Sequence, residues 1–269
     1  MTLFNFSDVE MLSFFMVLVR WSVLFSVLPF LGDRFIPAPV KILLPFSISI
    51  ALFPALILNK QIDLRETRIW GATVSGIIST LAVEVFFSLL LGYTAKLIFQ
   101  AILFGTHLVG NFMGFASATF YDPHQESQTE IVSQLQVTIA MLIFFALDGH
   151  HLMLRASLDS YRIVGIGKAC WSLNVMQRLI SMSSDVFSIS LQIAAPISVA
   201  SFSVNSVFGI ISKAMPQMNI LSLSLSITAL VGLFVLFLSL SEFHDFVQIL
   251  FSRMGDWMLE IMKLLKDRG

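Results

Sequence analysis

The sequence predicts an all-α integral membrane protein. Apolar residues make up 57% of the 269 positions and charged residues only 12%, about half the share that is usual in soluble domains. Several runs without charge also reach the roughly 20 residues that cross the hydrocarbon core of a bilayer, most clearly 186–212 and 214–241. Because lipid offers the backbone no hydrogen-bond partners, these runs are predicted to be helices.

Seven apolar blocks alternate with short polar turns along the chain. Two of the blocks, 42–58 and 131–147, are short for a membrane span, and segments of this length can be re-entrant or packed against protein. The longest polar stretch, 148–185, is expected to be soluble. With no internal repeat or linker, we expect a single membrane domain over 1–269. The blocks are 11–31, 42–58, 69–95, 97–121, 131–147, 186–212 and 214–241.

One stretch, 221–226, alternates Leu and Ser with the period of a β-strand. A lone strand facing lipid would leave its backbone groups without hydrogen bonds. We therefore predict a helix here as well.

The end of the chain predicts an amphipathic helix at about 242–266. Apolar residues recur three and four positions apart, as in Phe243, Val247 and Leu250, and polar residues fill the other face. Such a helix either lies on the membrane surface or docks on a partner. The basic residues Lys263, Lys266 and Arg268 favour a cytoplasmic C-terminus. At the other end, Asp8 and Glu10 stand where a signal peptide carries positive charge, so the N-terminal segment is expected to remain.

The sequence gives little support for an enzyme. Its one histidine cluster, His150-His151, consists of adjacent residues, which point about 100° apart on a helix and do not form a two-ligand face. We interpret this corner as a helix end at which Gly149 adopts a positive φ. The single Cys170 excludes an internal disulfide and a Cys-based metal site, and a net charge of −1 gives no reason to expect nucleic acid. We expect no catalytic residue, metal or cofactor.

Two ionisable residues fall inside apolar blocks, Arg20 within 11–31 and Glu84 within 69–95. A charge at this depth is costly unless it is paired or hydrated. One interpretation is an ion pair that fixes packing, within this chain or with a neighbour. The other is a hydrated path. An ion transporter usually carries more buried carboxylates than one.

The segment 104–124 combines small and bulky apolar residues. Gly110, Gly114 and Ala118 recur every four positions, a spacing that lets another helix approach closely. Between them stand aromatic and Met residues, and an Asp-Pro pair ends the segment. Glycine gives backbone freedom and Met adaptable bulk, so the pattern suits either a packed core or a deformable plug. The bulky residues are Phe112, Met113, Phe115 and Phe120.

The order of several motifs resembles the FliR/SctT family of the type III export apparatus. The match begins with Arg20, Pro29 and the Ile36-Pro37 turn, and continues through 110–116 and Asp122-Pro123. Later motifs are Gly149-His150-His151-Leu152, Ala195-Pro196-Ile197, Asn205, and Pro216-Gln217-Met218-Asn219. The Pro-Gln-Met-Asn motif is specific to the family, and its Met-Asn form is closer to the flagellar branch.

The resemblance implies a core subunit of the flagellar protein export gate. Such a subunit forms a helical assembly with FliP-like and FliQ-like membrane subunits, its hairpins partly raised out of the bilayer plane. It contacts further export-apparatus components and the unfolded proteins that pass through. The expected location is the bacterial inner membrane at the flagellar basal body. A small-molecule or ion secondary transporter is the alternative function.

The resemblance also implies roles for particular residues. The family's plug loop corresponds to about 108–124, within which Gly110 and Gly114 give the bend. The side chains that fill the closed pore are then Phe112, Met113, Phe115 and Tyr121. The residues expected to serve subunit packing or to be buried and polar are Arg20, Glu84, Asn205, Pro216, Gln217 and Asn219.

Overall fold

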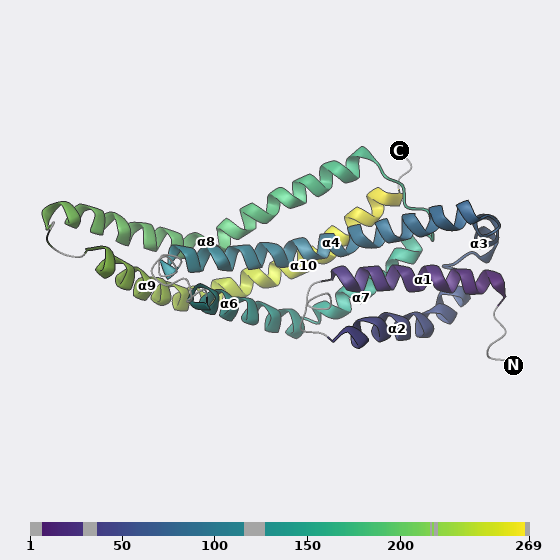
Figure 1. Cartoon of the computed structure of the whole chain (residues 1–269), viewed down its shortest axis with the longest axis horizontal. Coiled ribbons are helices and arrows are strands. Elements are labelled where there is room, and N and C mark those ends of the chain that lie inside the picture. Colours follow the sequence, from purple (N-terminus) through teal and green to yellow (C-terminus); the bar gives the residue numbers. More distant parts are fainter. Residues whose placement is uncertain (1–6, 29–36, 116–126, 216, 218–219, 267–269) are drawn as a thin grey trace. The chain divides into compact units, whose positions relative to one another are not determined.

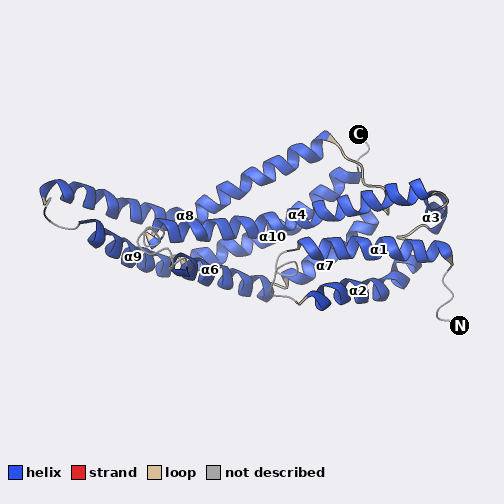
Figure 2. Cartoon of the chain, in the orientation of Figure 1, coloured by secondary structure: helices blue, strands red, loops and turns tan. Residues whose placement is uncertain are grey.

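The computed structural model describes residues 7–28, 37–115, 127–215, 217 and 220–266, and every regular element within these residues is a helix (Figure 1, Figure 2). The predicted all-α fold is therefore confirmed. The helices are α1 (Asp8–Val27), α2 (Ala38–Leu58), α3 (Leu64–Gly71), α4 (Val74–Phe112), α6 (Ser127–Ala146), α7 (Gly149–Ile163), α8 (Leu173–Ala214), α9 (Ile220–Leu238) and α10 (Leu240–Lys266).

Four of these helices, α1, α2, α4 and α8, are long and apolar enough to cross a membrane. Two helix pairs add to them if each pair counts as one broken span. They are Ile131–Ala146 with Gly149–Ile163 and Leu223–Leu238 with Leu240–Lys266, each bent by 61°. The described chain is thus an integral membrane protein with four to six helices that can span.

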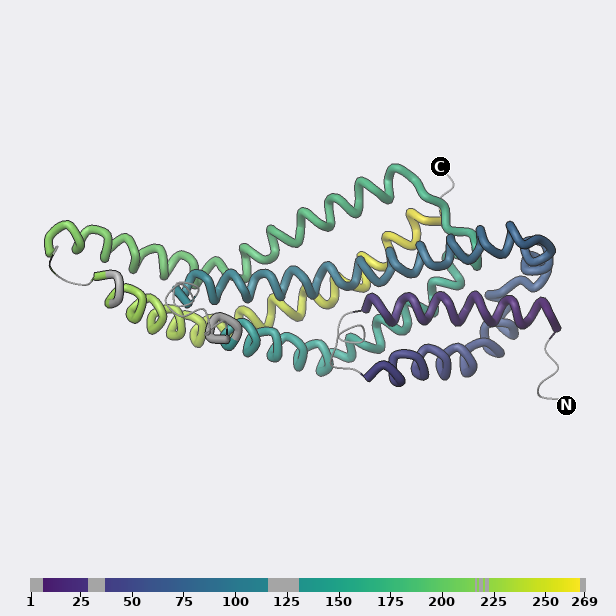
Figure 3. The backbone as a smooth tube through the Cα atoms, viewed as in Figure 1, coloured from purple at the N-terminus to yellow at the C-terminus, as the bar shows by residue number. Residues whose placement is uncertain are grey.

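Several element boundaries differ from the hydropathy blocks. The blocks 69–95 and 97–121 share one helix, α4, which continues through Lys96 and starts only at Val74 (Figure 3). The polar stretch 148–185, which lies outside the apolar blocks, holds α7 and the first turns of α8. A charged residue interrupts a hydropathy run without interrupting a helix, because Lys and Arg are good helix formers. The Leu-Ser alternation is helical, in α9, as predicted.

The corner before α7 is built differently from the prediction. The residue with positive φ is Asp148, at 53°, and Gly149 is already the first residue of α7. Glycine is needed at this position for space, because a Cβ there would overlap the ring of Phe144. The prediction of a positive φ at Gly149 is wrong by one residue.

The chain divides into two compact units, which we describe separately: Met1–Leu97 with His151–Ser181 and Arg253–Gly269, and Ile98–His150 with Met182–Ser252. In the first unit α1 packs against α2 and α3. In the second, the rings of Phe99, Phe144 and Phe251 lie 5.0 to 5.1 Å apart, centroid to centroid. That 1–269 behave as a single membrane domain stays a prediction.

The apolar face of α10 is buried in the chain itself. Its inward residues include Val247, Leu250, Met254, Met258, Ile261 and Met262, all of which have no exposed surface. This face therefore needs neither a membrane surface nor a partner to cover it, in contrast to both expectations from the sequence.

Candidate functional site

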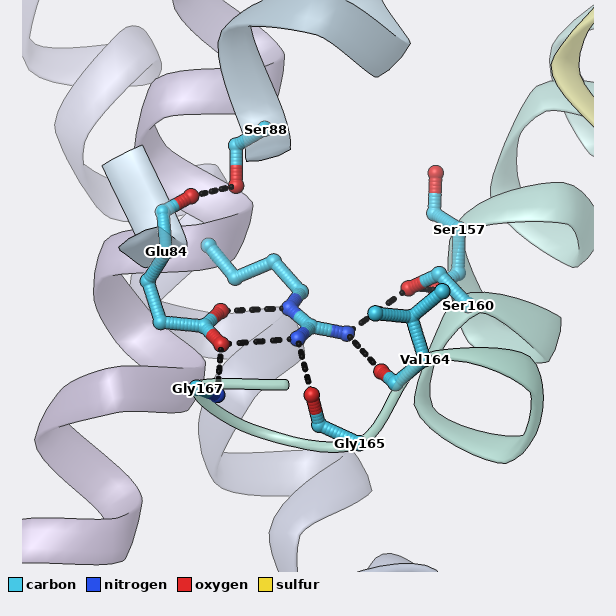
Figure 4. A network of polar contacts seen from close by, with 8 residues as sticks. Glu84, Ser88, Ser157, Ser160, Val164, Gly165 and Gly167 are labelled. Atoms are coloured by element: carbon cyan, nitrogen blue, oxygen red, sulfur yellow. Dashed lines mark hydrogen bonds and ion pairs between the residues drawn. The ribbon is translucent and has the colours of Figure 1, made fainter. Parts of the chain in front are cut away.

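A buried ion pair joins α1 to α4 in the first unit. The Arg20 guanidinium binds both oxygens of the Glu84 carboxylate, with Nε 2.6 Å from Oε2 and Nη2 2.8 Å from Oε1. Neither side chain is more than 3% exposed. Arg20 also donates to oxygens at the end of α7, namely Ser160 Oγ and the carbonyls of Val164 and Gly165, at 3.1, 3.2 and 3.5 Å (Figure 4).

The surroundings of the pair complete its interactions. The backbone N–H of Gly167 donates to Glu84 Oε1 at 2.8 Å (Figure 4). The rings of Phe87 and Tyr161 flank the guanidinium, with its carbon 4.6 and 4.3 Å from their centroids. Such contacts add cation–π attraction where water is excluded. The charges at membrane depth therefore neutralise each other inside one chain, which favours the ion-pair interpretation over a hydrated path.

The candidate gate segment, about 108–124, begins in the last turns of α4. The helix stops at Phe112, and Gly114 takes a φ of +85°, a left-handed conformation that side chains disfavour. The last turn is closed by the N–H of Met113 to the Val109 carbonyl and that of Gly114 to the Asn111 carbonyl, at 3.0 and 3.1 Å. This conformation ends the helix at Gly114, while the role of Gly114 in a plug stays a prediction.

Met113 is buried although it follows the last residue of α4. It has no exposed surface and belongs to the core of the second unit, with Val109, Val132, Ala194, Ile197 and Leu236. It packs into a notch in α9 at Gly232, where a Cβ would come within 2.6 Å of the Met113 Cγ. The absence of a side chain at Gly232 is therefore what allows Met113 to reach the helix.

Substitution of this notch gives a direct prediction. Gly232→Ala should lower the melting temperature of the detergent-extracted protein, because overpacking at such a contact costs about 1–3 kcal/mol. Gly209→Ala is the matched control, since no atom lies within 4 Å of a Cβ at that position of α8. We expect the control to be neutral or stabilising. Equal melting temperatures for the two variants would contradict the notch.

The other predicted gate residues differ in their environment. Gly110 is buried in α4, whereas Phe112 is 39% exposed and Phe115 is half-buried against the core around Met113. The segment is therefore partly packed and partly free to meet another chain. Tyr121 lies outside the described residues.

The polar residues assigned to subunit packing near the end of α8 do not form one cluster among the described residues. The Asn205 side-chain oxygen accepts a hydrogen bond from Thr228 Oγ1 at 3.2 Å, which connects α8 to α9. Gln217 is exposed in the turn between these helices. Pro216 and Asn219 lie outside the described residues, so the structure does not test their assignment.

Comparison with known proteins identifies the family. The family model described as bacterial export proteins, family 1, matches residues 11–254, which include every residue assigned above. The chain belongs to this family. As a bacterial export protein of family 1, it resembles proteins called flagellar biosynthetic protein FliR over nearly its whole length.

Three FliR proteins show how far this similarity extends. That of Buchnera aphidicola subsp. Baizongia pistaciae is 27% identical, over 96% of this chain and 98% of the relative. Those of Pectobacterium carotovorum and Escherichia coli K12 are 28% and 25% identical, over 94% of this chain in each case and 94% and 93% of the relatives. This member of the family is thus a membrane component of the flagellar export apparatus. The relatives are named for flagellar biosynthesis, not for a catalysed reaction.

Sequence reasoning missed several residues of these two sites. The carbonyls of Val164 and Gly165 bind Arg20 through the backbone, which leaves no signal in residue type. Gly232 did leave a signal in the sequence, because an isolated glycine inside an apolar helix often marks a position where another part of the chain packs closely against that helix.

Proposed function

We propose that this chain is a wall subunit of the type III export gate. With FliP-like and FliQ-like subunits it forms the channel through which unfolded flagellar proteins leave the cytoplasm. It carries out no catalysis and needs no cofactor. The assembly lies in the inner membrane at the flagellar basal body, and the basic end of α10 faces the cytoplasm.

The observation that carries this proposal is the length of the apolar helices. With 42 residues in α8 and 39 in α4, and a rise of about 1.5 Å per residue, these helices are roughly twice as long as the hydrocarbon core of a bilayer is thick. Large apolar side chains are exposed along all of α8, among them Leu173, Ile180, Phe187, Val199, Phe202 and Ile210. A bilayer cannot cover an apolar helix of this length completely, which supports a position among neighbouring protein subunits.

The gate itself is assigned to about 108–124. The packing of Met113 against Gly232 supports a closed state in which apolar side chains exclude water. The bend at Gly114 supports a segment that leaves the helix to enter the pore. In this proposal Phe112 and Phe115 complete the seal together with Tyr121, and the polar residues Asn205, Pro216, Gln217 and Asn219 serve subunit contacts.

The rival function, a secondary transporter, finds little support in the described residues. Their buried charged side chains are Arg20 and Glu84, and these are bound to each other. A transport cycle needs a buried group that can exchange its ion or proton. A carboxylate held by Arg20 and by the Gly167 N–H is poorly suited to that exchange.

Purification in a gentle detergent separates the two functions. A tagged chain is expected to be unstable alone and to carry two further small membrane proteins, identified by mass spectrometry. If the chain is instead recovered as a stable, monodisperse single component, the gate proposal is wrong. Transport of a small solute by that single component in vesicles would establish the rival.

A further inference from the structure

A polar pocket of about 750 Å³ lies within the first unit where α2, α7 and α10 end. Its walls are the connections 59–66 and 161–168, together with Lys266. The volume is in the range of small-molecule sites. Because α2 is long enough to span the membrane and ends at Leu58, the pocket lies at a membrane edge.

Three cations of this pocket, Lys60, Arg162 and Lys266, have no carboxylate partner among the described residues. The fourth, Lys168, is bound to Glu66 at 2.6 Å. The remaining acidic side chain, Asp63, accepts the N–H of Arg65 at the start of α3. Among the described residues that line it, the pocket therefore has an excess of positive charge.

Basic residues often stand at helix ends because they stabilise free carbonyls. Here several of those carbonyls already have other donors. The last turn of α2 is capped by the N–H groups of Asn59, Lys60 and Gln61. The carbonyls after α7 accept from Arg20, and the Leu265 carbonyl of α10 accepts from the Cys170 N–H. The three cations are thus available to a ligand.

The backbone at Lys60 gives a second, independent argument. Its φ is +55°, and the bonds from Lys60 N–H to the Ile57 carbonyl and from Gln61 N–H to the Leu56 carbonyl form a Schellman cap. Glycine is the usual residue at this position, since a side chain in the left-handed conformation is disfavoured. A lysine here is unfavourable for the backbone, which fits a need for its ammonium group at the pocket.

We propose that this pocket binds the headgroup phosphate of an anionic phospholipid. Phosphate is the anion that clustered Lys and Arg recognise best, and Arg162 can bind two of its oxygens at once. The lipid source follows from the position at the end of α2, where Leu58 is 82% exposed and can contact acyl chains. A free phosphate ion shares the headgroup's chemistry but gains nothing from this apolar neighbour. The inference does not depend on the gate function.

The cap at Lys60 allows a test that separates binding from stability. Lys60→Gly removes the cation, and glycine adopts the left-handed backbone conformation at this position more readily than lysine does. The variant is compared with the wild type as the full chain with its co-purifying subunits in neutral detergent, by calorimetric titration with dioctanoyl phosphatidylglycerol. At roughly 1 kcal/mol per basic residue, affinity should fall about fivefold, and by tenfold or more in Lys60→Gln/Arg162→Gln/Lys266→Gln. The melting temperature of Lys60→Gly should not fall.

A matched control removes the same charge elsewhere, in Arg155→Gln/Lys213→Gln/Arg253→Gln, three exposed cations that do not line the pocket. We expect it to bind phosphatidylglycerol as the wild type does, and we expect dioctanoyl phosphatidylcholine to bind more weakly than phosphatidylglycerol. Equal affinity of the pocket variants and the control would overturn the site. Displacement of the lipid by equimolar inorganic phosphate would overturn the lipid assignment.

Discussion

Arg20→Leu is expected to remove most of the folded protein from the membrane. The substitution leaves the Glu84 carboxylate buried with the Gly167 N–H as its remaining donor among those described. Removal of one partner from a buried pair costs about 3–5 kcal/mol, a large part of the 5–15 kcal/mol that stabilises a typical protein. The measurement is the level of the tagged chain in membranes and its melting temperature after extraction.

The double variant Arg20→Leu/Glu84→Leu provides the sharper comparison. It removes both charges and leaves no unpaired carboxylate, so it should be more stable than Arg20→Leu alone. Arg155→Leu, on the exposed face of α7, serves as the control and should have little effect. If Arg20→Leu is as stable as this control, the network in Figure 4 does not support the fold.

Deletion of residues 110–115 is expected to make the membrane leak small solutes when the gate is assembled. The deletion removes Met113 and Gly114, and with them apolar side chains that exclude water from the closed pore in the proposed gate. Leakage is measured as solute influx into cells, or as ion flux into vesicles that contain the co-purified complex.

The deletion could unfold the chain, so a single substitution provides a milder test of the same assignment. Met113→Ser should give a smaller leak, whereas Met11→Ser, at a position 59% exposed on α1, should give none. Co-purification of the partner subunits shows that each variant assembles. A tight membrane around an assembled deletion variant would disprove the assignment of the plug.

Hydropathy predicted the apolar helices but not their ends, and it did not predict α7, which lies in the polar stretch 148–185. A long apolar run in lipid has almost no alternative to a helix, so even the Leu-Ser stretch in α9 was predictable. The ends depend on local caps and on contacts from elsewhere in the chain. The burial of the apolar face of α10 is set by such contacts, which leave little trace in composition.

At the candidate sites, too, some features were predictable from the sequence and others were not. An ion pair was one of two interpretations of Arg20 and Glu84, because a charge in apolar surroundings needs a partner or water, but the sequence did not show that the two bind each other. Their further hydrogen bonds to Val164, Gly165 and Gly167 run through backbone atoms, and no residue type reveals them. The bend at Gly114 agrees with its sequence, whereas the corner at Gly149 was misassigned because the ring of Phe144, not the backbone angle, requires the glycine.

The Arg20 network has a consequence for the synthesis of the chain in the membrane. Arg20 and Glu84 can meet once α4 has been made, but the oxygens of Ser160, Val164 and Gly165 follow only later. Until then, part of the guanidinium lacks its acceptors. A nascent chain that stops between α4 and α7 therefore retains an incompletely bonded charge at membrane depth, and the finished subunit does not.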